Sequence, residues 1–402
     1  MIGGGPAGLI AAEQLAEAGA SVDLYDAMPS VARKFLLAGI GGMNITHSEP
    51  FDQFSQRYGN AGAWLRPMLE HFGPAELVDW IHELGIETII GSSGRVFPVE
   101  MKAAPLLRKW KHRLTQSGVR FHPRHRWVGW DQQDRLVFES QSGQVAVKYD
   151  VCVLALGGGS WSKLGSNGAW IPLLLQRGVD VTPLVASNCG YEVFWSDHLV
   201  QRADRQAIKK VGLSVEGFDE SKISEVMITD YGIEGTGIYA MGTYIRRAIN
   251  STGVAVLKMD LFPDRSAEQL SKVLARGAPK VSLANRLRKN LSMSPAQIAL
   301  ANEEGVLSRL DEQQIVARLK GVTLRLSKAR PIDEAISTAG GISPDAILPS
   351  LMLKQLPGVF VAGEMLDWDA PTGGYLLTGC FTTGVKAGRS AAGWLRSRST
   401  TC

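Results

Sequence analysis

Gly3-Gly4-Gly5-Pro6-Ala7-Gly8 decides the fold expected of this chain, because it reads as G-x-G-x-x-G. Glycines at these three positions allow a tight turn, a backbone that approaches a pyrophosphate, and close packing of a helix on a strand. Residues 6–18 are rich in Ala, Leu and Glu, which favour a helix, and Gly19 then ends it as a C-cap. The start of such a helix directs free N–H groups and a positive dipole end at a phosphate.

The residues on either side of this turn extend the pattern. Residues 21–26 form an alternating short strand that ends at Asp26, where an acid accepts hydrogen bonds from an adenosine ribose. An ordinary glycine turn is the alternative, and the order of helix, strand and acid argues against it. Only Met1 and Ile2 precede the turn, so we expect either a short first strand or a start that lies upstream.

Composition indicates a globular protein with a sizeable core. Hydrophobic residues make up 45% of the 402 residues, charged residues make up 20%, and the net charge is only +4. The four cysteines lie far apart, which argues against a zinc site or a redox pair and favours a reducing compartment. No apolar run approaches the length of a membrane span, and no signal peptide precedes the phosphate turn. We therefore expect a cytoplasmic protein with no metal and no membrane partner.

Four further segments combine glycines with the end of a strand or the start of a helix. They are the loop 39–46, the exit of the apolar run 151–156, the exit of the short strand 359–362, and the turn 372–375. Glycines at this density let backbone amides approach a flat ring system, although a surface loop is the alternative for 39–46. The residues that these segments contribute are Gly41, Gly42, Met43, Asn44, Gly157, Gly158, Gly363, Glu364, Gly373, Gly374 and Tyr375.

A last helix, expected to begin near Thr378, contains Gly379, Gly384 and Gly388. A glycine inside a helix costs about 1 kcal/mol relative to alanine. Three of them at a spacing of four to five residues therefore predict that another element packs closely against that face.

The order of these segments predicts a nucleotide-binding domain that is interrupted by an insertion. Residues 1–187 form its first part and residues 331–402 its second part. The inserted substrate domain, 188–330, has a β part at 188–262, a helical part at 263–320 and a return strand at 321–327. Helical and strand patterns alternate within the nucleotide-binding parts, so the class is α/β.

Six stretches together resemble the YhiN/BaiN-type bacterial FAD-dependent oxidoreductases, which are also called aminoacetone-oxidase-like proteins. The stretches are GGGPAG, ARKFLLAGIGGMNIT, SSGRVFP, LALGGGSWSKLGSNG, ARPIDEAISTAGGIS and AGEMLDWDAPTGGY. They span the whole chain in the family's order. The resemblance implies a glutathione-reductase-like Rossmann FAD-binding domain, interrupted by an inserted β-barrel-like plus helical domain.

The resemblance also assigns roles to residues. The ADP half of FAD would be held by the phosphate turn and Asp26, and the flavin would lie near Lys34 and the loop 41–44. The expected cofactor-binding residues are Gly3, Gly5, Pro6, Ala7, Gly8, Asp26, Lys34, Gly41, Gly42, Met43, Asn44, Gly157, Gly158, Gly363, Glu364, Gly373, Gly374 and Tyr375.

Two departures from the family pattern indicate a divergent subfamily. The family's GGGRCN appears here with Gly42 and Met43 in place of its Arg and Cys, and its THxGxSGP-like stretch appears as residues 229–237. Activities that depend on that Arg, Cys or His are not expected to carry over.

The function expected is that of an FAD-dependent oxidoreductase, fed by NADH or NADPH, that reduces an activated C=C in a small molecule or in an RNA uracil. The alternatives are a flavin amine oxidase that uses oxygen, and an FAD-containing non-catalytic module that binds RNA or protein. The chain has no second G-x-G-x-x-G, so NAD(P)H is expected to visit only transiently. Basic residues of the insert are interspersed with acids, which is no strong nucleic-acid signature.

Four residues are candidates for proton transfer or substrate binding. His47 follows the loop 41–44, and Arg95 follows a glycine turn and could bind an anionic group. Asp230 and Tyr231 lie in a glycine-rich stretch of the insert and could line a pocket. For each of them a solvent-exposed or purely structural position is the alternative.

Overall fold

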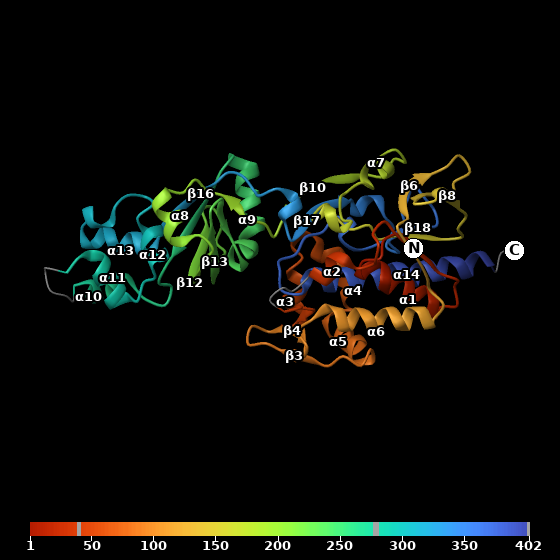
Figure 1. Cartoon of the computed structure of the whole chain (residues 1–402), viewed down its shortest axis with the longest axis horizontal. Helices are drawn as coiled ribbons and strands as arrows, with labels where there is room; N and C mark the ends of the chain where they lie inside the picture. The colour runs from red at the N-terminus through yellow and green to blue at the C-terminus, as the bar shows by residue number, and fades with distance from the viewer. Residues whose placement is uncertain (38–41, 276–280, 400–402) are drawn as a thin grey trace. The chain divides into compact units, whose positions relative to one another are not determined.

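A computed structural model describes residues 1–37, 42–275 and 281–399. The chain divides into two compact units, each described here by itself: Met1–Ala186 together with Ile336–Cys402, and Ser187–Ala335 (Figure 1). Within the described residues, no helix combines the length and apolar character needed to cross a membrane.

A parallel sheet lies at the centre of the first unit. Strand β1 (Asp23–Asp26) pairs with β5 (Arg120–Pro123), and β9 (Cys152–Leu154) pairs with β18 (Val359–Val361). Ile2 joins the two pairs, because it forms parallel bridges to both Tyr25 and Leu154. The two residues before the glycine turn therefore form the short central strand that the Rossmann pattern requires. β9 and β18 are buried throughout, as expected for strands covered on both faces.

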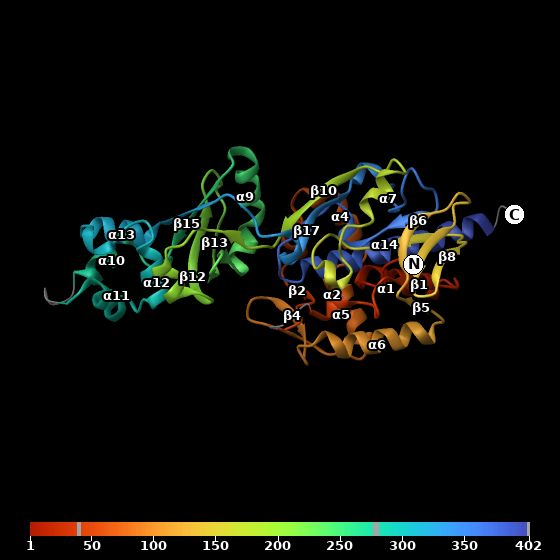
Figure 2. The same ribbon diagram turned by 45° about the horizontal axis from the view of Figure 1, so that its top comes forward.

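Helix α1 (Pro6–Glu17) packs against the long helix α14 (Tyr375–Ser399), and the two lie side by side in both views (Figures 1 and 2). The glycines of α14 make this contact close. A Cβ on Gly384 would lie 2.5 Å from the Ala7 carbonyl oxygen, and one on Gly388 would lie 2.7 Å from the Ala11 carbonyl oxygen. The glycine spacing of this helix thus predicted a real packing constraint. Because Gly384 and Gly388 have no Cβ, α14 contacts the backbone of α1 directly.

The remaining elements of the first unit surround this core. Their helices are α2 (Arg33–Leu37), α3 (Phe51–Gln56), α4 (Gly62–Leu69), α5 (Pro74–Glu83), α6 (Ala103–Gln116) and α7 (Ile171–Leu175). A small antiparallel sheet joins β2 (Thr46–His47), β4 (Arg95–Pro98) and β3 (Thr88–Ile90), and a meander joins β6 (Arg126–Trp130), β7 (Leu136–Ser140) and β8 (Gly143–Val147). Strands β10 (Val181–Ser187) and β17 (Ser337–Ile342) pair with each other.

The second unit contains a six-stranded antiparallel sheet in the order β11-β14-β13-β12-β15-β16. The strands are β11 (Tyr191–Glu192), β12 (Gln206–Val215), β13 (Ser221–Thr229), β14 (Gly232–Glu234), β15 (Ala255–Asp260) and β16 (Val322–Leu326). A bridge from Tyr191 to Ala329, just after β16, joins the two ends of the sheet. The sheet therefore curls round on itself, as the β-barrel-like prediction requires.

Helices accompany this sheet. They are α8 (Asp197–Ala203), α9 (Thr236–Thr252), α10 (Ala267–Leu274), α11 (Leu283–Leu291), α12 (Pro295–Ala301) and α13 (Glu312–Lys320). Serine or aspartate caps α8, α10, α11, α12 and α13, each side chain accepting a hydrogen bond from a backbone N–H of the first turn. The helical part is continuous in sequence between β15 and β16.

Candidate cofactor site

The three glycines of the phosphate turn serve three different purposes. Gly3 has a φ of +96°, and a Cβ there would lie 2.2 Å from the Ala155 carbonyl oxygen. A Cβ on Gly8 would lie 1.9 Å from the Gly3 carbonyl oxygen, so Gly8 permits the helix to pack on the turn. A Cβ on Gly5 would meet no atom within 4 Å. Gly5 is therefore bare toward open space, which is what a phosphate group needs at a helix N-terminus.

A cavity lies at this open side of the turn, and all of its lining residues belong to the first unit. Predicted cofactor residues that line it are Gly3, Gly5, Pro6, Ala7, Asp26, Lys34, Gly157, Gly363 and Glu364. Residues from the meander and from the segment after Gly157 complete the wall: His125, Arg126, Trp127, Ser162, Ser166, Asn167 and Trp170.

Three buried polar atoms at this cavity have no hydrogen-bond partner among the described residues. They are Nε of Arg33, Nε1 of Trp127 and Oγ of Ser166. A buried donor without a partner costs roughly 1–3 kcal/mol, so such groups normally have one. The cavity thus offers a bare helix N-terminus and unsatisfied donors to a ligand. These features fit the phosphates and ribose of a dinucleotide.

Asp26 binds the phosphate turn as well as lining the cavity. Its Oδ2 accepts a hydrogen bond from the Gly4 N–H and its Oδ1 one from the Met28 N–H, both at 2.8 Å. Burial raises the pKa of this carboxyl, and the two backbone hydrogen bonds oppose the rise. Each oxygen keeps a second lone pair for a ribose hydroxyl. Asp26 therefore fixes the glycine turn and also lines the cavity in which we expect the cofactor.

A polar cluster joins the start and the end of the chain at the cavity. The Lys34 ammonium donates to Glu364 Oε2 at 2.8 Å and to Ser160 Oγ at 2.7 Å. The Thr338 N–H donates to the other oxygen, Glu364 Oε1, at 3.0 Å. A Cβ on Gly158 would lie 1.8 Å from Thr338 Oγ1, so glycine is required there for the cluster to close. The sequence predicted Lys34 and Glu364 separately and contained no signal for their pairing.

The loop expected at the flavin is described only from Gly42 onward, and Gly41 lies outside the described residues. Met43 is buried in the core. Asn44 donates its amide to the carbonyls of Thr46 and Val96, whereas its buried Oδ1 has no partner among the described residues. Asn44 thus fixes the loop through its amide and leaves one acceptor for a ligand.

The turn before α14 packs on this loop. Gly373 and Gly374 have φ values of +130° and +96°, and a Cβ on Gly374 would lie 2.4 Å from the Thr46 Cα. The Tyr375 hydroxyl donates to Glu49 Oε1 at 2.5 Å, and Arg57 donates to both oxygens of that carboxylate. Tyr375 is buried, and burial, followed by the bond to Glu49, raises its pKa. The Tyr375 phenol therefore fixes the position of the Glu49 carboxylate through a hydrogen bond. Neither Glu49 nor Arg57 was predicted from the sequence.

The structure brings His47 and Arg95 together as directly paired residues of β2 and β4. His47 uses both ring nitrogens: Nε2 lies 2.9 Å from the Ser93 carbonyl oxygen, and Nδ1 accepts from the Glu49 N–H at 3.1 Å. Its ring also stacks on Tyr375. The guanidinium of Arg95, in contrast, has no hydrogen-bond or ion-pair partner among the described residues. Neither His47 nor Arg95 is among the residues that line the cofactor cavity.

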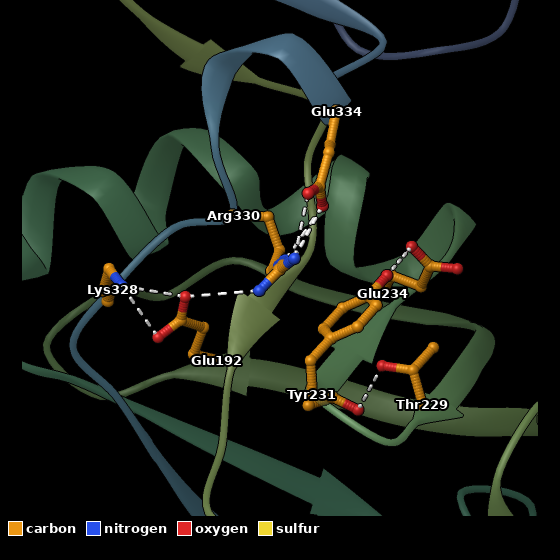
Figure 3. A network of polar contacts seen from close by, with 8 residues as sticks. Glu192, Thr229, Tyr231, Glu234, Lys328, Arg330 and Glu334 are labelled. Carbon is orange, nitrogen blue, oxygen red and sulfur yellow. Dashed lines mark hydrogen bonds and ion pairs between the residues drawn. The ribbon is translucent and has the colours of Figure 1, made fainter.

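Asp230 and Tyr231 lie in the second unit, at the turn from β13 to β14, where Asp230 is exposed. The Tyr231 hydroxyl donates to Glu234 Oε2 at 2.5 Å, and the guanidinium of Arg330 lies 4.3 Å from the centre of its ring (Figure 3). Arg330 also pairs with Glu192 and Glu334. Burial, followed by the bond to Glu234, raises the pKa of Tyr231, so its phenol is protonated at neutral pH.

Sequence reasoning missed several residues that line the cavity. Arg33, Trp127, Ser166 and Trp170 line the cavity, and the Trp170 indole donates to the Gly157 carbonyl oxygen at 2.9 Å. A buried tryptophan in a meander is usually a core residue, so its sequence gives no hint of a ligand. Ser166, within the stretch GSNG, carried the only usable signal.

Comparisons with known proteins agree with this geometry. A family model described as "HI0933-like protein Rossmann domain" matches residues 1–390. A 3-dehydro-bile acid delta(4,6)-reductase of Clostridium scindens is 25% identical over 98% of each chain. A ribosomal RNA dihydrouridine synthase of Haemophilus influenzae is 23% identical over 93% of each chain.

Solved structures show the same fold at lower identity. A flavocytochrome c3 fumarate reductase matches with a TM-score of 0.54 and 15% identity, over 98% of this chain and 78% of that one. The 3-ketosteroid-delta4-(5alpha)-dehydrogenase of Rhodococcus jostii matches with a TM-score of 0.51 and 16% identity, over 97% and 95%. Together with the family match, they confirm the Rossmann-type fold that the glycine turn predicted.

Proposed function

We propose that this chain reduces an activated C=C with NAD(P)H as the hydride source. The premise of the proposal is that the chain belongs to the HI0933-like Rossmann family and is an FAD-dependent oxidoreductase. One observation supports this reaction above the others. Two relatives that align with nearly the whole chain are named for a delta(4,6)-reductase and a dihydrouridine synthase. Both names denote a ring double bond that is conjugated to a carbonyl and becomes saturated.

The reaction assigns one task to a side chain of the first unit. Bound FAD supplies the hydride carrier. Reduction of a conjugated C=C builds negative charge on the carbonyl oxygen and requires a proton at the neighbouring carbon. Arg95, with its unpaired guanidinium, is the group that we assign to the carbonyl oxygen.

The same residue makes the amine-oxidase alternative less suitable. An amine oxidase needs a group that accepts a proton from the substrate or binds a cationic amine. Arg95 is a cation and performs neither task. The proposed substrate is therefore a neutral or anionic conjugated carbonyl compound, and a small enone and an RNA uracil both satisfy this chemistry.

Separate anaerobic half-reactions test the proposal. The FAD-loaded protein is mixed first with NADH or NADPH, and loss of the oxidised flavin absorbance is followed. The reduced protein is then mixed with a steroid 4-en-3-one, its saturated ketone, or a uridine-containing RNA. We expect bleaching by one nicotinamide, and recovery of the absorbance with an unsaturated substrate but not with the saturated ketone. No bleaching by either nicotinamide, with rapid bleaching by a primary amine, would overturn the proposal in favour of an oxidase.

A variant tests the role of Arg95. Arg95→Gln should slow the oxidation of the reduced protein by the unsaturated substrate by roughly 10²-fold, as loss of a group that stabilises an oxyanion does, and leave the nicotinamide step unchanged. Arg108→Gln is the matched control, because it removes an exposed cation from α6 of the same unit. Equal slowing by Arg108→Gln would show a general disturbance of the unit instead.

A further inference from the structure

A second cavity, of about 630 Å³, lies in the first unit between α4, the loop 344–351 and the middle of α14. It has no lining residue in common with the cofactor cavity. Its walls are mostly apolar and include Trp64 and Phe72 on one side and Ile347 and Leu351 on the other. It is therefore a separate site with its own chemistry.

The charged residues of this second cavity are all basic. Lys386 and Arg389 line it together with His71 and the neutral polar residues Thr382 and Ser390, and none of the described residues that line it is acidic. The Lys386 ammonium, half-buried on α14, has no hydrogen-bond or ion-pair partner in the described part of the chain. Arg389 uses its Nε to donate to Gln14 Oε1 at 2.7 Å, which leaves its terminal nitrogens for another partner. The cavity therefore combines an apolar wall with a cation, Lys386, that has no anionic partner in the described part of the chain.

The position of the two cations follows from the packing of α14. Gly384 and Gly388 lie against α1, so Lys386 lies on the opposite face of the helix. Arg389 lies at the edge of the contact with α1, where it reaches Gln14, and it also lines the cavity. Lys386 and Arg389 are three residues apart and thus neighbours on the helix surface. This spacing would allow a single anionic head group to contact both cations.

We propose that this cavity binds an amphiphilic carboxylate of the fatty-acid class, with its carboxylate between Lys386 and Arg389 and its alkyl chain along the apolar wall. The volume lies within the range of about 300–1,000 Å³ that small-molecule pockets occupy. A second copy of the chain is the less suitable occupant. The protein has a net charge of +4, and the cavity adds two cations without an acid to pair with them. Binding here is independent of the reaction proposed above.

The test is calorimetric titration of the FAD-loaded protein with dodecanoate, below its micelle concentration. Dodecanol and dodecylammonium, with the same alkyl chain and a neutral or cationic head, are the matched ligands. We expect saturable binding of dodecanoate at one site, binding of dodecanol weaker by about tenfold or more, and no binding of dodecylammonium. Equal binding of all three, or of none, would overturn the proposal.

Variants locate the site. Lys386→Met should weaken dodecanoate binding by about tenfold, and Leu348→Glu, which adds an acid to the partly exposed wall, should abolish it. Arg398→Met is the control, because it removes a cation from the same helix outside the cavity. The flavin absorbance of each variant verifies its fold. Retained binding in Leu348→Glu would place the ligand elsewhere. A concentration-dependent dimer in sedimentation velocity that Lys386→Met abolishes would favour a second copy as the occupant.

Discussion

Lys34 of α2 and Glu364, which follows β18, form an ion pair across 330 residues of sequence, with Nζ 2.8 Å from Oε2. The side chains are 28% and 12% exposed, so the pair is largely shielded from water. It lies in the wall of the cofactor cavity and joins both parts of the nucleotide-binding unit. Folding of the cavity therefore depends on residues from opposite ends of the chain.

Removal of this pair should weaken cofactor retention. In Lys34→Met the carboxylate of Glu364 loses its cation beside a site for an anionic ligand, so we expect a loss of about 2 kcal/mol in the free energy of unfolding and at least about tenfold in FAD affinity. Equilibrium dialysis measures the affinity. Lys320→Met is the control, because Lys320 pairs with Asp260 at 2.6 Å in the second unit with similar exposure. Equal loss of FAD from both variants would indicate a general loss of stability.

Gly5 and Gly8 should respond differently to a side chain. Gly5→Val places its side chain in open space at the phosphate turn, so the unfolding free energy of the cofactor-free protein should change by less than about 0.5 kcal/mol while FAD retention is lost. Gly8→Ala should lower stability and FAD retention together, because its Cβ overlaps the Gly3 carbonyl oxygen. Retention of FAD by Gly5→Val would refute the assignment of this turn.

Glu13 should make stability depend on pH. It is buried on α1, where it accepts a hydrogen bond from the Trp110 indole at 2.8 Å and pairs with Arg113. Burial is the largest influence and raises its pKa above the ordinary 4.5, although Arg113 opposes this. The folded state therefore binds the proton more tightly than the unfolded state does. The resulting stability is complete below the ordinary pKa and is lost as the pH rises through the raised pKa.

The difference in unfolding free energy between the wild type and Glu13→Gln isolates this effect, because the other groups cancel. We expect the difference to fall as the pH rises above about 4.5, by no more than about 1.4 kcal/mol per pH unit. Urea denaturation at a series of pH values measures it. A difference that is constant with pH, or that increases, would contradict the raised pKa.

Two glycines of the same helix should give opposite results with alanine. Gly393→Ala should stabilise the protein by about 1 kcal/mol, because its Cβ meets nothing within 4 Å and alanine favours a helix. Gly384→Ala should destabilise it, because its Cβ would lie 2.4 Å from Ile10 and 2.5 Å from the Ala7 carbonyl oxygen. Thermal unfolding distinguishes the two. Stabilisation by both would mean that α14 does not contact α1 as described.

Most of the fold prediction rested on local sequence pattern. The spacing of Gly3, Gly5 and Gly8 reflects the backbone geometry of a single turn. Because glycine has no Cβ, its role in such a turn can be inferred from the sequence without knowledge of its tertiary neighbours. The short first strand is visible only in the tertiary structure, where Ile2 bridges Tyr25 and Leu154, because a strand is defined by its neighbours.

The sequence by itself thus determined the Rossmann class, and it predicted the glycine turn and Asp26 as the residues that hold phosphate and ribose, because each depends on neighbouring residues. Only the tertiary structure decided that Lys34 pairs with Glu364, that Tyr375 holds Glu49, and that both nitrogens of His47 are already engaged. It also decided that Trp127 and Ser166 present unpaired polar atoms to the cofactor cavity. Side-chain partners distant in sequence are selected by packing, and no periodicity or spacing encodes them.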